Sequence, residues 1–186
     1  SIDGINIKDY KLSNLRKNIG IVLQDVFLFS DTIFNNITLK DDSISLDQVK
    51  LAAKQIGVHD FIMSLPNNYY YNVKERGIML SSGQRQLIAF LRVYVSDPQI
   101  LILDEATSSI DSTSEILIQN ATEKLTKNRT SLIIAHRLAT IKKANNIIVM
   151  DSGNIIEQGS HKELISNLDG YYKKLYDVQF QVKNVS

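Results

Sequence analysis

The chain has 186 residues, 44% of them hydrophobic and 22% charged, which is enough for one folded domain with its own core. Its net charge of +1 gives no overall field that would attract nucleic acid or an acidic membrane surface. The absence of cysteine excludes a disulfide framework and a thiolate zinc site, and no apolar run approaches the roughly 20 residues that span a bilayer.

The first part of the chain predicts one strand followed by a helical region. Residues 1–7 have the pattern of a strand or hairpin already under way, and because no initiator Met precedes them we interpret the chain as a fragment. Residues 19–23 form a short apolar run that predicts a buried strand. Residues 32–79 contain no comparable run, so they predict a mostly helical insertion with one helix over residues 46–56.

Helices and strands alternate in the middle of the chain. Apolar residues at helical spacing predict helices over residues 81–95 and 111–125. The apolar residues of the first lie on one face and are Leu87, Ile88, Leu91 and Val95, and those of the second are Ile116, Leu117, Ala121 and Leu125. Apolar runs predict strands at residues 100–103, just after the turn signal Asp97-Pro98, and at residues 132–135. This alternation, with strands that are apolar throughout, is typical of an α/β domain whose parallel sheet is covered on both faces.

The end of the chain predicts a hairpin and a closing helix. Residues 147–150 and 155–157 are apolar and flank the turn sequence Asp151-Ser152-Gly153-Asn154, which predicts two antiparallel strands. The helix is predicted over residues 170–180.

A polar residue with useful chemistry follows each of the three predicted strands. Gln24 follows the first, Asp104 and Glu105 end the second, and His136 follows the third. Loops are polar in general, so any one of these positions has an ordinary explanation. If the strands are parallel neighbours, however, all four side chains converge at the sheet edge where ligands bind. The set suits transfer of a phosphoryl group to water, since carboxylates can hold Mg²⁺ and deprotonate water.

The predicted helix over residues 81–95 begins with a capping box. Ser81 and Gln84 have the spacing in which each side chain binds the backbone N–H of the other residue, so an ordinary helix start is one interpretation. The other is an anion site, because a helix N-terminus offers free N–H groups and Gly83 lets a phosphate approach the backbone.

These segments, in this order, resemble the motifs of the ABC transporter ATP-binding domain. Leu80-Ser81-Ser82-Gly83-Gln84 is similar to the signature motif, which normally reads Leu-Ser-Gly-Gly-Gln. The other matches are the Q-loop glutamine at Gln24, the Walker B strand with its catalytic glutamate at residues 100–105, the D-loop at residues 108–111 and the switch histidine at His136. Glu75-Arg76-Gly77 resembles a segment typical of exporters.

The resemblance covers nearly the whole chain and implies an α/β fold of the P-loop NTPase type. It implies a mostly parallel sheet with flanking helices and a helical signature subdomain, incomplete at the N-terminal side. Residues 1–30 would be the end of the N-terminal β part with the Q-loop, and residues 31–96 the helical signature subdomain. Residues 97–186 would be the core with the Walker B, D-loop and histidine segments and the C-terminal helices.

The resemblance also implies a role for each residue at the strand ends. Gln24 would link the nucleotide site to the membrane domain and help to position Mg²⁺ or water. Asp104 would bind Mg²⁺ through water, and Glu105 would be the general base. His136 would contact the γ-phosphate.

The signature residues would act on nucleotide held by another subunit. Ser81, Ser82, Gly83 and Gln84 would contact the γ-phosphate of ATP that is bound mainly by the opposite domain, and Asp111 would lie at the interface between the two. The implied cofactors are ATP and Mg²⁺. The implied partners are a second ATP-binding domain, in a head-to-tail dimer, and a transmembrane domain fused upstream, which places the chain at the cytoplasmic face of a membrane.

The sequence departs from the family pattern in three ways. Leu87 stands where many members have arginine. Ser82 replaces the first glycine of the signature, a small change whose hydroxyl could itself donate to phosphate. The string G-x-x-x-x-G-K-[ST], which forms the P-loop of the family, does not occur. We therefore expect this chain alone to bind ATP weakly and to be inactive as an ATPase.

Three hypotheses about function follow. The first is the ATPase motor of an ABC exporter. The second is an ABC ATPase that moves nucleic acid or chromosomes. Residues 32–79 are too short for the long coiled coil of such proteins, and no basic patch in the sequence supports contact with DNA. The third is a truncated, non-catalytic module that only pairs with a partner. The presence of Glu105 and His136 argues against this hypothesis, because degenerate sites often lose such residues.

Overall fold

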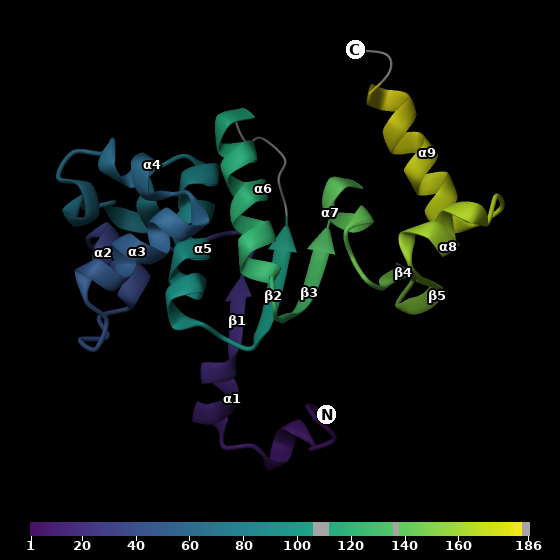
Figure 1. Cartoon of the computed structure of the whole chain (residues 1–186), viewed down its shortest axis with the longest axis horizontal. Coiled ribbons are helices and arrows are strands. Elements are labelled where there is room, and N and C mark those ends of the chain that lie inside the picture. Colours follow the sequence, from purple (N-terminus) through teal and green to yellow (C-terminus); the bar gives the residue numbers. More distant parts are fainter. Residues whose placement is uncertain (106–111, 136–137, 184–186) are drawn as a thin grey trace. The chain divides into compact units, whose positions relative to one another are not determined.

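The computed structural model describes residues 1–105, 112–135 and 138–183 (Figure 1). The chain divides into two units, residues 1–134 and 135–186, which are described in turn. The helices and strands of the first unit are η1 (Ile7–Asp9), α1 (Leu12–Asn18), β1 (Ile19–Val22), α2 (Ile33–Thr38), α3 (Leu46–Ile56), α4 (His59–Met63), η2 (Asn68–Tyr70), η3 (Glu75–Gly77), α5 (Ser82–Ser96), β2 (Ile100–Glu105), α6 (Ser112–Thr126) and β3 (Thr130–Ala135).

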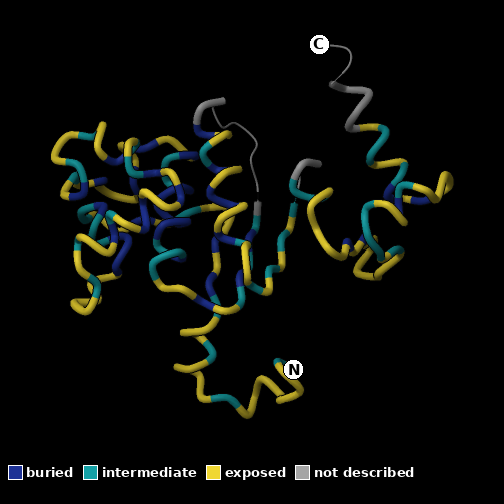
Figure 2. Tube along the Cα trace, in the orientation of Figure 1, coloured by how far each residue is buried: buried dark blue, intermediate teal, exposed yellow. Residues whose placement is uncertain are grey.

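The sheet of the first unit has the strand order β1-β2-β3, and its arrows point the same way in Figure 1. β1 and β2 are parallel, with a register that runs from Ile19 opposite Ile100 to Val22 opposite Leu103. The prediction of an α/β fold with parallel strands and flanking helices is confirmed. Before β1, the chain starts with a tight turn closed by a bridge between Ile2 and Ile5, and Figure 2 shows that this part is mostly exposed.

One face of the sheet is buried and the other is open. Gly20 and Val22 of β1 lie in register with Leu101 and Leu103 of β2, and all four are buried on the side where α5 packs against β1. On the other side Ile21, Leu132 and Ile134 are 52%, 58% and 52% exposed. Within the first unit the expectation of a sheet covered on both faces is therefore not met, because side chains alternate across a strand and the helices of this unit cover one side only.

The region between β1 and β2 is helical, as predicted. Helix α3 begins with a capping box at Ser45 and ends at Gly57, which adopts a left-handed conformation. It buries Val49, Ala52, Ala53 and Ile56, whose spacing is that of one helical face.

Helix α5 is the centre of the hydrophobic core. It packs against α2, α3, α6 and β1, and Leu87, Ile88 and Leu91 are each at most 1% exposed. Phe90 is also buried, so α5 is covered on nearly all sides, whereas its spacing predicted one apolar face. The positions of α2, α3, α6 and β1 therefore depend on their packing against α5.

Helix α6 buries Ala121 and Leu125 as predicted, but one residue of its predicted apolar set is exposed. Ile118, Ala121 and Leu125 are fully buried, but Ile116 is 61% exposed. Two residues along an α-helix correspond to a turn of about 200°, so Ile116 and Ile118 point in opposite directions and only one of them can reach the core.

The second unit is a hairpin with three helices. Its elements are α7 (Leu138–Lys142), β4 (Ile147–Asp151), β5 (Asn154–Gly159), α8 (His161–Ser166) and α9 (Tyr171–Lys183). The predicted hairpin is confirmed, and its two turn residues Ser152 and Gly153 both have positive φ, +49° and +80°. The closing helix is confirmed as α9, whose first N–H groups bind the carboxylate of Glu157.

Within the described ranges, no helix combines the length and the apolar character needed to cross a membrane. The division of the chain into functional segments at residues 30 and 96 stays a prediction.

The close contact at Gly20 gives a test of the packing between α5 and the sheet. A Cβ atom on Gly20 would lie 2.6 Å from Cγ of Pro98 and 2.7 Å from Cγ1 of Val93. We expect Gly20→Ala to lower the free energy of unfolding by about 2 kcal/mol, because neither neighbour can withdraw without disturbing the core. Denaturant unfolding measures this value. The control is Ile21→Ala on the open face, with an expected loss below about 1 kcal/mol, and equal losses in the two variants would contradict the packing.

Candidate functional site

The carboxyl edge of the sheet brings Gln24 to the side of Asp104 and Glu105. The β1–β2 ladder ends where Val22 lies opposite Leu103, so Leu23 and Gln24 leave the sheet at the end where Asp104 and Glu105 complete β2. Gln24 is exposed in a bend, and Asp104 is half-buried. By strand alternation Asp104 belongs to the open face, with Ile102. The side chain of Glu105 lies outside the described residues.

His136 and Asp111 also lie outside the described residues. His136 directly follows β3 in the sequence, and β3 is the neighbour of β2. The condition on which the predicted convergence depends, three adjacent strands with the same direction, is met (Figure 1). The position of the histidine itself stays a prediction.

The start of α5 is a complete capping box, as predicted. Ser81 is the N-cap, and its hydroxyl accepts a hydrogen bond from the N–H of Gln84 at 3.2 Å. The side-chain oxygen of Gln84 accepts from the N–H of Ser81 at 3.0 Å. Ser82 is exposed and Gly83 is buried, and as the first helical residues they have no intrahelical acceptor for their N–H groups. This end of α5 can therefore bind an anion.

The segment before α5 has an unusual backbone. Lys74 has φ +61° and ψ −171°, Arg76 has φ +50° and Gly77 has φ +69°. A Cβ atom on Gly77 would lie 2.9 Å from Cδ1 of Leu28, which is fully buried. The glycine thus lets the turn before the signature residues pack closely on the segment that follows Gln24.

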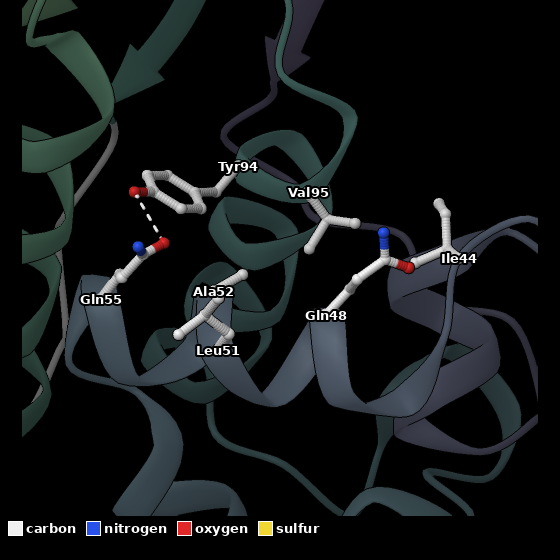
Figure 3. A pocket seen from close by; sticks show the side chains of 7 residues that line it. All are labelled: Ile44, Gln48, Leu51, Ala52, Gln55, Tyr94 and Val95. Atoms are coloured by element: carbon white, nitrogen blue, oxygen red, sulfur yellow. Dashed lines mark hydrogen bonds between the residues drawn. The ribbon is translucent and has the colours of Figure 1, made fainter.

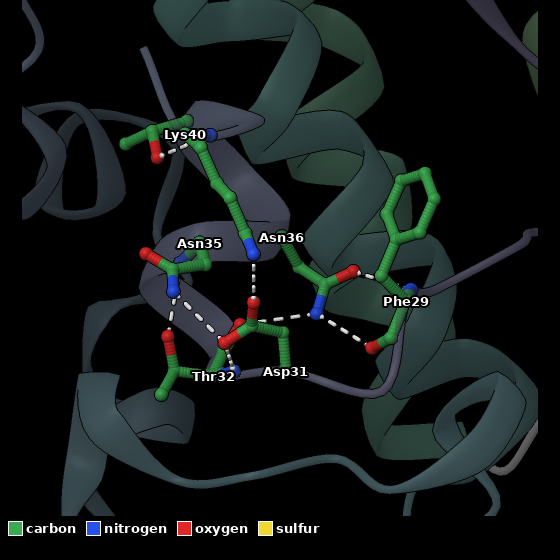
Figure 4. Close-up of polar contacts among 7 residues, drawn as sticks. Phe29, Asp31, Thr32, Asn35, Asn36 and Lys40 are labelled. Atoms are coloured by element: carbon green, nitrogen blue, oxygen red, sulfur yellow. Dashed lines mark hydrogen bonds and ion pairs between the residues drawn. The ribbon is translucent and has the colours of Figure 1, made fainter. Parts of the chain in front are cut away.

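A polar network centred on Asp31 holds the chain at the start of α2 (Figure 4). The carboxylate of Asp31 binds the ammonium of Lys40 at 2.9 Å, the side-chain amide of Asn35 at 2.8 Å and the N–H of Thr32 at 2.7 Å. The Lys40 and Asn35 contacts, together with the Thr32 N–H, lower the pKa of Asp31 to about 2. No short motif marks this network in the sequence, and our sequence analysis missed it.

The described histidines each pair with a tyrosine. Nδ1 of His59 lies 2.8 Å from the hydroxyl of Tyr69, and Nδ1 of His161 lies 2.7 Å from that of Tyr172. Burial raises the pKa of Tyr69 to about 12. In the parts of the chain that the structure describes, no three histidine or acidic side chains gather as a metal site.

A hollow of about 220 Å³ lies between α3 and α5, lined by Ile44, Gln48, Leu51, Ala52, Gln55, Tyr94 and Val95 (Figure 3). The hydroxyl of Tyr94 donates to Gln55 across it at 3.3 Å. Tyr94 and Val95 belong to the last turn of α5, at the opposite end of the helix from Ser81. The hollow is therefore separate from the candidate site.

Comparison with known proteins adds independent information. The family model described as ABC transporter matches residues 1–108. Putative multidrug export ATP-binding/permease proteins of Staphylococcus aureus are 49% identical over 178 residues, and YgaD of Bacillus subtilis, which has the same description, is 48% identical. The alignments cover 96% of this chain but only 31% and 30% of the relatives, so the chain spans about a third of their length.

A solved structure has the same fold. A bacterial Atm1-family ABC exporter with ATP bound superposes with a TM-score of 0.84 and is 41% identical in sequence. The match covers 95% of this chain and 31% of the exporter chain.

The low pKa of Asp31 predicts a pH dependence of stability. A carboxyl whose pKa is lower in the folded than in the unfolded state stabilises the fold above its unfolded pKa, and this contribution disappears as the pH falls from about 4 to about 2. We expect Asp31→Asn to be less stable by about 1 kcal/mol at neutral pH and to lack this part of the acid titration. Asp47→Asn is the control, since that side chain is 95% exposed. Thermal unfolding between pH 2 and pH 7 measures both variants, and an unaltered acid profile in Asp31→Asn would contradict the assignment.

Proposed function

Since the chain belongs to the ABC transporter family, we propose that, as part of a polypeptide of the relatives' full length, it binds and hydrolyses ATP as the motor of an exporter that moves solutes across a membrane. The observation that carries this proposal is the parallel register of β1 and β2, by which Gln24 leaves the sheet beside Asp104 and Glu105. Our proposal places His136 on the nucleotide at this edge, and the start of α5 on the nucleotide held by a second copy.

The residues at the sheet edge fit a magnesium ion. Mg²⁺ prefers oxygen ligands and keeps several waters, so one carboxylate and one amide oxygen are a sufficient protein contribution. In our proposal Asp104 and Gln24 hold the ion, Asp104 through water. When bound, Mg²⁺ neutralises charge on the phosphates.

The protein groups carry out the proton transfer and hold the phosphate. Glu105 would accept a proton from the attacking water, and Gln24 would orient that water. His136 would donate a hydrogen bond to a γ-phosphate oxygen as negative charge develops there.

The start of α5 would contact the nucleotide of a second copy. In this arrangement the N–H groups of Ser82 and Gly83 and the hydroxyls of Ser81 and Ser82 point to the γ-phosphate of ATP held mainly by the partner. The oxygen of Gln84 already binds the N–H of Ser81, so its side-chain nitrogen is the atom left for phosphate. Asp111 would lie at the interface of this head-to-tail dimer.

A membrane domain is the second proposed partner. The relatives are described as ATP-binding/permease proteins, and the chain matches about a third of their length. Phe27 and Phe29, which soon follow Gln24, are 56% and 54% exposed and touch edge to face with ring centres 5.1 Å apart. Such a rigid aromatic pair suits contact with a protein partner. We place the chain at the cytoplasmic face of the membrane, without a nucleic-acid partner.

Glu105→Gln tests the catalytic assignment in a polypeptide of the relatives' full length. We expect ATP binding to be kept and turnover to fall by about a hundredfold or more, because the amide cannot accept a proton. The measurements are phosphate release and equilibrium binding of labelled ATP. Glu123→Gln, which alters an exposed carboxylate on α6, should leave turnover unchanged. Full turnover in Glu105→Gln would reject the general base, and an absence of ATP binding by the parent protein would favour a non-catalytic interaction module.

Gly83→Asp tests the contact across the dimer. A carboxylate at this position would repel the γ-phosphate and fill the space next to the helix N-terminus, so we expect ATP-driven dimerisation to be lost. Analytical ultracentrifugation with and without ATP measures this. Ser152→Asp, which introduces the same carboxylate at the exposed tip of the β4–β5 hairpin, is the control. Normal dimerisation of Gly83→Asp would rule out the proposed contact.

A further inference from the structure

Asn36 holds the backbone that follows Gln24. Its side chain is fully buried. Its oxygen accepts from the N–H of Phe29 at 2.8 Å, and its nitrogen donates to the carbonyl of Phe29 at 3.0 Å and to that of Thr32 at 3.0 Å (Figure 4). The amide thus satisfies both backbone groups of Phe29, as a neighbouring strand would. The side chain of Asn36 therefore holds the end of the segment formed by residues 27–29.

Arg92 fastens the same segment to α5. Its Nε donates to the carbonyl of Asn36 at 2.8 Å, and its Nη2 reaches the carbonyl of Phe27 at 3.4 Å. The carbonyl of Asn36 lies in the last turn of α2, where carbonyl groups lack an intrahelical donor. Burial lowers the pKa of Arg92 from its ordinary value, yet a guanidinium stays charged, so these are charge-assisted hydrogen bonds.

Apolar contacts also hold the segment formed by residues 27–29 in place. Leu28 is fully buried in the core and packs against the turn at Gly77. Phe27 and Phe29, on either side of it, face solvent. The hydrogen bond from Arg92 to Phe27 connects the segment to α5 directly, and the bond from Arg92 to Asn36 connects it through α2. With the burial of Leu28, these contacts oppose a shift of the segment relative to α5.

We propose that Arg92 and Asn36 are positioning residues that make Gln24 and the helix starting at Ser82 move as one body. This inference rests on the proposed function, in which Gln24 serves the nucleotide of its own copy and the start of α5 serves that of the partner. When contact with phosphate moves α5 together with the elements packed on it, Arg92 carries Phe27 and Phe29 along, and with them Gln24, three residues before Phe27.

Arg92→Lys is the first test, in a polypeptide of the relatives' full length. Lysine keeps the positive charge but cannot donate to two carbonyls in the planar geometry of arginine. We expect kcat for ATP hydrolysis to fall about tenfold while KM for ATP changes less than about twofold, because only the alignment of Gln24 is affected. The matched control is Tyr94→Phe, which removes the hydrogen bond from α5 to Gln55 two residues further along the same helix. We expect it to keep the parent kcat.

A second test measures the segment itself. The chain contains no tryptophan, so Phe29→Trp introduces a single fluorescent reporter at an exposed position. In the 186-residue chain we expect Arg92→Lys and Asn36→Ala to lower the fluorescence anisotropy of this tryptophan, and Tyr94→Phe to leave it unchanged.

The outcomes separate this inference from the proposed function. A lower kcat with lower anisotropy in Arg92→Lys, against an unchanged Tyr94→Phe, supports the coupling. A kcat equal to that of Tyr94→Phe, or a parallel loss of kcat, ATP affinity and thermal stability, overturns it and leaves Arg92 a structural residue. If turnover is insensitive to Glu105→Gln, the proposed function fails instead.

Discussion

The burial of helix α5 is the constraint on which the rest of the first unit depends. The helix packs against α2, α3, α6 and β1, and its side chains make up much of the core. Burying an aliphatic side chain stabilises a fold by roughly 1.5–3 kcal/mol, so Leu87, Ile88 and Leu91 together resist displacement of the helix strongly. Because α5 is fixed along its length, its capped start and the segment held by Arg92 have a defined relation to each other. The two nucleotide contacts proposed at these places can therefore respond together.

Local patterns predicted much of this fold. The three strands, the helical region between the first two, the capping box at Ser81 and the hairpin at Ser152-Gly153 each depend on residues close together in the sequence. The chemistry at the strand ends was also visible, because a parallel sheet brings the carboxyl ends of its strands to one edge. Gln24 and Asp104 illustrate this, since each follows directly from an apolar run.

The remaining features depend on contacts between distant residues. Apolar runs do not say which face of a strand is covered, and Ile21 and Ile134 lie on the open one. The prediction for α6 chose Ile116 instead of Ile118 because both are apolar and only tertiary packing distinguishes them. The carbonyl of Asn36 accepts a hydrogen bond from Arg92, 56 positions later in the sequence, so no short motif reveals this contact. The positive φ of Lys74 and Arg76 has no marker either, since such conformations are usually occupied by glycine or asparagine.

The most direct test of the central claim is the reactivity of a thiol at the start of α5. The chain has no cysteine, so Ser82→Cys in an otherwise cysteine-free polypeptide of the relatives' full length places one thiol among the signature residues. Its rate of alkylation is measured with and without Mg²⁺ and a non-hydrolysable ATP analogue. The account predicts that the nucleotide strongly slows alkylation, because phosphate and the partner copy cover this end of the helix. An unchanged rate at saturating nucleotide would contradict the account.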